Sequence, residues 1–243
     1  MTAHPEFAYV QARLQARHGA LLLPLAWQVL EASHTASHYL ALARSGPMAR
    51  WVETLDDAQD PHRVERHLRS QWRAYVEAVA SWMPQRWQPA LRWFGRLSDL
   101  ALIDALQRDA RDAHWLRRDE SLAASCTAAS SAALAPDANA GESDIATRWL
   151  AEWTRRLPGD AHDAALLRQP AERLLPRLRG PEHARSAADE PTRRALHKLF
   201  RRHAATAVAA FAHLALVALD VERLRGGLVM RALFENPPET AAV

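Results

Sequence analysis

The sequence TRRALHKLFRRHAATAVAAFAHLALVALDVERLR, from Thr192 to Arg225, carries the strongest structural signal in the chain. Its 34 residues include neither glycine nor proline, and most of them have high helix propensity. The stretch therefore predicts one continuous helix, roughly 50 Å long at about 1.5 Å per residue. Pro191 suits the first helical position, with Asp189 or Glu190 as the cap before it.

Apolar residues in this stretch recur three, four or seven positions apart, which is the spacing of a helical stripe. The stripe comprises Leu196, Phe200, Ala204, Ala207, Phe211, Leu214, Ala218, Val221 and Leu228. Between Ala204 and Leu219 the other faces are also apolar, except at His213, so we expect burial on most sides. Charge returns at Asp220, and Gly226 with Gly227 permits a break or kink.

Composition predicts an all-α fold. The 243 residues are 49% hydrophobic and 24% charged, which is ordinary for a globular protein, and only 8 are glycine. No segment alternates apolar and polar residues as a half-buried strand does. We expect residues 1–243 to form a single helical domain, a multi-helix bundle organised around the long C-terminal helix.

Caps, prolines and apolar spacing place the remaining helices. Asp60 and Pro61 are a good cap and first-turn pair, and Ser98 with Asp99 caps a later helix. The expected helices span residues 5–23, 24–45, 48–55, 61–82, a short segment between Pro84 and Pro89, 98–115, 143–157, 161–167 and 170–178.

An Ala/Ser-rich stretch, residues 123–142, almost lacks large apolar side chains. We interpret it as a mobile loop between a tryptophan-rich N-terminal half and a C-terminal half that carries the long helix. Trp82, Trp87 and Trp93 crowd around prolines, where such rings most often wedge a helix corner together; the alternative is an exposed aromatic docking patch.

Charge and cysteine content bound the setting of the protein. The net charge is only +3, and Lys198 is the one lysine among 31 basic residues. Cys126 is the only cysteine, which excludes an internal disulfide and favours a reducing compartment; its loop position argues against a nucleophile. The first twenty residues do not resemble a signal peptide, and the apolar run at 204–219 is too short to span a bilayer. We expect a cytoplasmic protein, free or peripheral on the cytoplasmic face of the inner membrane.

Catalytic and cofactor motifs are not found. The chain has no GxxxxGK[ST] and no GxGxxG, so it does not bind nucleotides by those routes. His34 and His38 are four apart and could share a helical face as metal ligands, but the chain has no HExxH motif, and an exposed or capping role is favoured. We expect no cofactor, no metal and no small-molecule substrate.

Two arginine patterns suggest binding surfaces. Arg193-Arg194 and Arg201-Arg202, with His203, could form a phosphate-binding stripe, but the low net charge weighs against nucleic acid as a partner. Tyr9, Arg13 and Arg17 stand four apart, so they line one side of the first helix. Arg13 could stack on Tyr9 while Arg17 reaches an acidic partner. This row is either an ordinary surface ladder or a docking or intramolecular lock.

Four short stretches resemble the d/AC39 family of V-type/A-type ATPase subunits, also called the C type. They are Tyr9–Arg17 followed by Leu21-Leu22, then His62–Leu68, then Asp99-Leu100, and finally the run Asp220–Gly226. They are similar to the family's tyrosine with alanine-arginine pairs, its Glu-x-x-Leu step, its Asp-hydrophobic helix start and its closing acidic run. The family is usually longer, and Arg223 stands where its members carry asparagine, so the chain resembles a short, divergent, bacterial-type member.

The resemblance implies an all-helical, non-catalytic subunit that couples a membrane rotor ring to the central stalk of a rotary ATPase. Its partners would be the central-stalk and rotor subunits, for proton or other ion transport. The partner-binding residues expected on this basis are Tyr9, Arg13, Arg17, Asp220, Arg223 and Arg225. The alternative is a helical adaptor or regulatory scaffold in another assembly, which would use the Trp82–Trp93 corner or the arginine row.

Overall fold

The computed structural model describes residues 5–56, 60–108, 132–134, 144–159, 164–179 and 185–235. Every regular element among these residues is helical, which confirms the all-α prediction. The elements are η1 (Pro5–Phe7), α1 (Ala8–Gly19), α2 (Pro24–Glu31), α3 (Ala36–Arg44), α4 (Ala49–Val52), α5 (Pro61–Trp82), η2 (Gln85–Trp87), α6 (Gln88–Phe94), η3 (Gly95–Asp99), α7 (Leu100–Arg108), α11 (Ile145–Arg155), α12 (Ala164–Arg179), α13 (Arg185–Arg202) and α14 (Ala207–Glu235).

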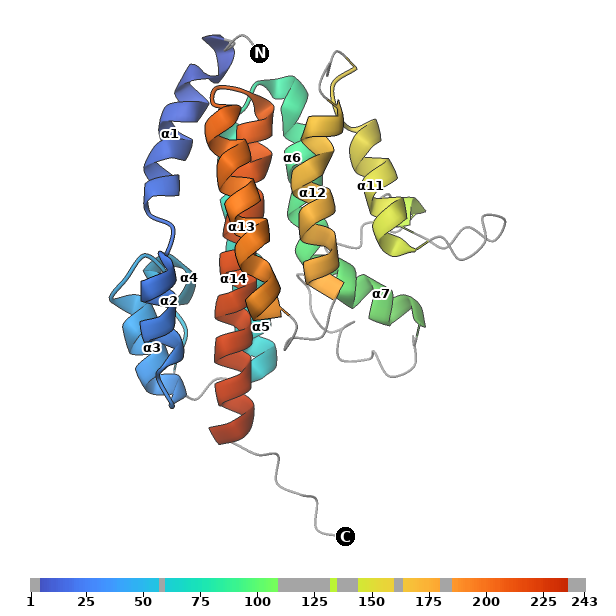
Figure 1. Cartoon of the computed structure of the whole chain (residues 1–243). Coiled ribbons are helices and arrows are strands. Elements are labelled where there is room, and N and C mark those ends of the chain that lie inside the picture. Colours follow the sequence, from blue (N-terminus) through green and yellow to red (C-terminus); the bar gives the residue numbers. More distant parts are fainter. Residues whose placement is uncertain are drawn as a thin grey trace.

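The C-terminal part of the chain is a helical hairpin. The prediction of one continuous helix over Thr192–Arg225 is therefore wrong, because α13 ends at Arg202 and α14 starts at Ala207. The two helices pack along each other at the centre of the molecule (Figure 1). The predicted start at Pro191 is also wrong, since α13 begins at Arg185 and Pro191 lies inside it.

The chain reverses at Ala205, whose φ of 57° is the left-handed conformation that L-residues with a Cβ rarely adopt. The Ala205 N–H donates to the side-chain oxygen of Gln11 in α1, at 2.8 Å. Next to it, the Thr206 hydroxyl donates to the His203 carbonyl at 2.7 Å. The two bonds give partners to one backbone N–H and one backbone carbonyl in the turn between the helices. The strain at Ala205 is tolerated because the turn lets the apolar faces of α13 and α14 cover each other.

α14 is the centre of the fold. Every residue from Thr206 to Val221 is buried, which confirms the expected burial around His213. The helix packs against α13, α5, α12, α3 and α1. The helix does not break at Gly226-Gly227, since α14 continues to Glu235. Gly227 instead permits a close approach, since a Cβ there would lie 2.3 Å from the Tyr39 hydroxyl of α3.

The N-terminal helices follow their cap residues. The helix predicted over 24–45 is two helices, and Thr35 caps the second by accepting a bond from the His38 N–H at 3.2 Å. The Asp60 cap of α5 is confirmed, because its carboxylate accepts from the His62 N–H at 3.2 Å. Ser98 and Asp99 do not cap a helix; they end the 3-10 turn η3, which leads directly into α7.

Trp93 wedges two helices together, as the first of the two interpretations expected, and two tryptophans of α11 take part in the same contact. The Trp93 indole donates to the Trp149 carbonyl, and the Trp153 indole donates to the Ala90 carbonyl, each at 3.1 Å. The Trp149 and Trp153 rings stack with centroids 6.0 Å apart. These contacts fix α11 against α6, on the side of the bundle away from α1 (Figure 1).

Two further expectations concern the segment that joins the halves. Most of the predicted 123–142 loop lies outside the described residues, as does the helix end at 109–115. Residues 132–134 are helical and Leu134 is buried. The two helices predicted at 161–167 and 170–178 are wrong, because α12 runs without a break through Pro170 and Pro176.

Across the described ranges, none of the helices combines the length and the apolar character that crossing a bilayer requires. A single cluster of buried apolar side chains extends from Phe7 in the first turn to Leu228 in α14. α14 thus packs on both the N-terminal and the C-terminal helices.

The reversal at Ala205 makes opposite predictions for two glycine substitutions. Ala205→Gly relieves the left-handed strain and should stabilise the protein by about 0.5 kcal/mol. Ala209→Gly, inside buried α14, should destabilise it by at least about 1 kcal/mol. Denaturant unfolding of both variants measures the difference. Equal destabilisation by the two glycines would mean that Ala205 lies within a continuous helix.

Candidate functional site

The first candidate site is a row of alternating arginines and aromatic rings, which we call the arginine ladder. It runs from α1 across α5 to α4, which are neighbours in the fold. Its guanidinium groups belong to Arg13, Arg17 and Arg50, and its rings to Tyr9, Trp82, Tyr75 and Trp51.

Each guanidinium of the ladder lies over two rings. Arg13 is 5.0 Å from the Tyr9 centroid and 4.9 Å from that of Trp82. Arg17 is 4.4 Å from Trp82 and 4.7 Å from Tyr75. Arg50 is 4.6 Å from Tyr75 and 5.2 Å from Trp51. The expected stacking of Arg13 on Tyr9 is therefore confirmed, and the rings favour cations along the whole row.

The ladder carries positive charge without a carboxylate to balance it among the described residues. Within the chain Arg17 stacks on rings, and its Nη1 is buried without a hydrogen-bond partner. Its contact with an acidic partner stays a prediction. Burial lowers the pKa of Arg50, and the nearby charge of Arg17 lowers it further. Sequence reasoning missed Arg50, because no local spacing connects α4 with α1.

The second group of predicted site residues lies on α14 and is engaged within the molecule. Asp220 is 1% exposed and accepts a bond from Arg193 of α13 at 2.5 Å. Arg223 forms a two-pronged pair with Glu31 of α2, at 2.6 and 2.7 Å. Charge does return at Asp220, but α13 covers this carboxylate.

Arg225 completes this group. It donates to Glu65 of α5 at 2.8 Å and to Glu222 at 3.0 Å. Burial raises the pKa of Asp220 above its ordinary value, while Arg193 opposes the rise. These pairs attach the second half of α14 to α13, α2 and α5. Partner binding by Arg223 and Arg225 stays a prediction.

A cluster of three histidines lies behind the ladder. His18 of α1 and His197 of α13 share a hydrogen bond of 3.1 Å, and His18 stacks on Phe200 with centroids 3.9 Å apart. His213 of α14 is fully buried and bonds to the Tyr75 hydroxyl at 2.6 Å. Tyr75 therefore belongs to both groups, since its ring faces the arginines and its hydroxyl faces His213.

Burial keeps these histidines neutral. It lowers the pKa of His18 to about 4, helped by His197 and Arg201, and lowers the pKa of His213 to about 3, helped by His18 and Arg17. The pKa of His197 is also lowered, chiefly by burial and then by Arg193. Protonation would place new positive charge where arginines already converge.

The remaining sequence candidates do not assemble into a site in the described part of the chain. His34 and His38 are exposed, and His34 precedes α3, so the two do not share a helical face. No group of three potential metal ligands occurs among the described residues. Cys126 lies outside them. In the proposed phosphate stripe, Arg193 is buried against Asp220 and Arg194 pairs with Glu190 at 3.3 Å, so this stripe is partly neutralised.

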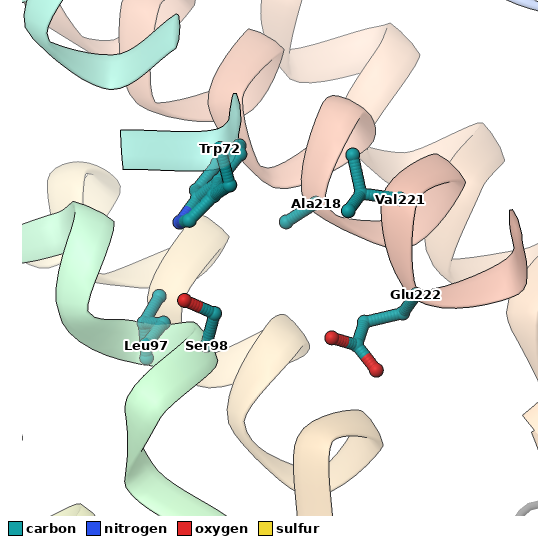
Figure 2. Close-up of a pocket in the computed structure, with 6 residues that line it drawn as sticks. All are labelled: Trp72, Leu97, Ser98, Ala218, Val221 and Glu222. Carbon is teal, nitrogen blue, oxygen red and sulfur yellow. The ribbon is translucent and has the colours of Figure 1, made fainter. Parts of the chain in front are cut away.

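Figure 2 shows a hollow beside α14, which is too small for a substrate. Its volume is about 10 Å³, at the lower limit for one water molecule. Trp72 of α5 closes one side, and its indole is fixed by a 2.7 Å bond to the Gly95 carbonyl. The rest of the lining is Leu97, Ser98, Ala218, Val221 and Glu222.

The ladder, the histidine cluster and the α14 ion pairs therefore gather around α5 and α14 from segments distant in sequence. Tyr75 of α5 and His213 of α14, for example, are in direct contact. Comparison with known proteins yields no match: no family model fits the sequence, and no curated protein or solved structure matches the chain.

The histidine cluster predicts that stability decreases in acid. His213 has a folded pKa far below the ordinary 6.5, so its contribution is fully present above pH 6.5. It is lost as the pH falls toward the folded value, at up to about 1.4 kcal/mol per pH unit. His213→Gln, whose amide can still bond to Tyr75 but does not titrate, should show a shallower decrease in unfolding free energy between pH 7 and 5. Identical slopes would contradict this assignment.

The buried ion pair between Asp220 and Arg193 predicts that a nearly isosteric substitution at Asp220 strongly lowers the unfolding free energy. Asp220→Asn leaves the charge of Arg193 buried without a counterion and should lower the unfolding free energy by about 3–5 kcal/mol. Glu77→Gln breaks the exposed pair with Arg92 and should lower it by less than about 1 kcal/mol. Thermal or urea unfolding compares the two. Similar small losses would show that Asp220 and Arg193 are not coupled.

Proposed function

We propose that this chain is a non-catalytic coupling component of a V/A-type rotary ATPase, similar to the d/AC39 (C-type) family. In this role it links the membrane rotor ring to the central stalk. It needs no cofactor and no small-molecule substrate of its own, and it would sit peripherally on the cytoplasmic face of the inner membrane. Its partners are the central-stalk and rotor subunits.

The observation that carries the proposal is the convergence of the four family-like stretches on one helix. The second stretch, His62–Leu68, is part of α5. The closing stretch reaches this helix through the 2.8 Å pair between Arg225 and Glu65. The first and third stretches meet α5 further along the same helix. All four stretches are therefore joined through α5, which is what supports the proposal.

The other two contacts are equally specific. Arg17 of the first stretch lies over Tyr75 and Trp82 of α5, at 4.7 and 4.4 Å. Asp99 of the third stretch accepts a bond from Arg73 of α5 at 3.0 Å and is 1% exposed. The resemblance therefore follows a connected set of polar and stacking contacts.

The way the core is built suits a mechanical part. Two polar groups in α14 hold neighbouring helices: His213 bonds to α5 and Asp220 to α13. Phe94, Trp153 and Phe211 pack ring against ring, with Trp153 and Phe211 5.1 Å apart and perpendicular. Close packing and directed bonds resist sliding of one helix past another, as torque transmission requires.

A second candidate function is an adaptor or regulatory scaffold in a different assembly. It is favoured by exposed apolar side chains around α2, where Leu23 and Leu25 are 72% and 71% exposed and Val29 is 55% exposed. Leu25 and Val29 are four apart and share one face of the helix. Such a face fits an apolar partner helix in many kinds of complex.

Affinity capture from the native organism separates the two functions. A tagged chain, isolated from gently solubilised membranes, should bring down central-stalk and rotor-ring subunits of a rotary ATPase, identified by mass spectrometry. The variant Leu25→Asp/Val29→Asp, altered on α2, and the untagged strain serve as references. Capture of a defined complex without any rotary ATPase component would contradict the coupling role and favour the adaptor.

A further inference from the structure

We propose that the arginine ladder binds an acidic segment of a partner protein, whose carboxylates neutralise Arg13, Arg17 and Arg50. This inference deepens the proposed function by naming the chemistry of the partner surface, and it rests on that function only for the partner's identity. The binding surface spans α1, α5 and α4, and it includes Arg50, which lies outside the family-like stretches.

The first argument is charge. Three arginines on or beside α14 are matched with carboxylates, in the pairs Arg193–Asp220, Arg223–Glu31 and Arg225–Glu65. Arg17 and Arg50 both lie over the Tyr75 ring, and each also lies over a tryptophan ring. Two cations held this close repel each other, so an anionic partner gains more here than at an isolated surface arginine.

The second argument is the orientation of the donors. A guanidinium stacked face-on against a ring keeps its N–H edge available, and that edge matches a carboxylate in two parallel hydrogen bonds. Arg13 and Arg50 are exposed, so their N–H edges are open to such a carboxylate, whereas Arg17 is half-buried.

The third argument is shape. The three cations form a row and not a single cradle: Arg13 and Arg17 are one helical turn apart, and Arg50 lies beyond Tyr75 on another helix. A row matches carboxylates repeated along a segment better than it matches one small oxoanion. The rings of Tyr9 and Trp82, exposed and half-buried respectively, add apolar surface for the partner's methylene groups.

Titration calorimetry of the full chain with a hexaglutamate peptide tests the proposal directly. Binding at low salt should be clear, should weaken as salt screens the charges, and should be absent with hexaglutamine. Arg17→Gln with Arg50→Gln should weaken hexaglutamate binding by about tenfold or more. Arg63→Gln with Arg66→Gln, which removes the same charge from exposed positions of α5, should change it by less than about twofold.

Three outcomes would overturn the assignment: no binding of hexaglutamate, equal weakening by the two double variants, or binding of inorganic phosphate as tight as that of the peptide. The last would make the ladder a small-oxoanion site. Circular dichroism verifies that each variant is folded. If the Arg17/Arg50 double variant is not folded, the single variant Arg50→Gln, at an exposed position, replaces it in the test. Because isolated protein and peptide are used, failure here leaves the ATPase proposal standing, and failure of the capture experiment leaves this site standing.

Discussion

Complete burial of α14 between Thr206 and Val221 is the constraint on which the rest of the structure depends. A helix surrounded on all sides needs neighbours that approach closely, and the many alanines of α14 allow this. It also needs a partner for each polar side chain that it carries inward. Tyr75 supplies one for His213 and Arg193 supplies one for Asp220. The helices that provide these groups, α5 and α13, are consequently fixed in place.

The same constraint positions the surface. The hydroxyl of Tyr75 is held from inside by His213, and its ring then presents a fixed face to Arg17 and Arg50 outside. Tyr75 thus connects the arginine ladder at the surface with His213 in the core. A partner that neutralises the two arginines would act on a tyrosine bonded to the central helix, which gives a short physical path from the surface to α14.

Local chemistry predicted a good part of this fold. The all-helical class, the buried middle around His213 and the Asp60 cap depend on residue spacing and on neighbours within a few positions, and the structure has them. The stacking of Arg13 on Tyr9 is also local, because the two residues are one turn apart on α1. In each case a single helix contains all the atoms that matter.

The sequence predictions failed where residues far apart in the sequence determine the local structure. The reversal at Ala205 has no glycine or proline to announce it, and its turn is completed by Gln11 from the other end of the chain. Thr206, a good helix cap beside it, was the one local sign. Asp220 was named as a partner-binding residue on the family resemblance, but α13 folds back and covers it with Arg193. Arg50 joined the site only through tertiary packing.

The most direct test of the hairpin that encloses α14 is a distance between spin labels on its two arms. Labels at Arg194→Cys and Leu233→Cys, in a Cys126→Ser background, occupy exposed positions on α13 and α14. Because Arg193 contacts Asp220, the hairpin predicts a separation of about 22 Å. A value near 58 Å, the span of an unbroken helix, would contradict the account.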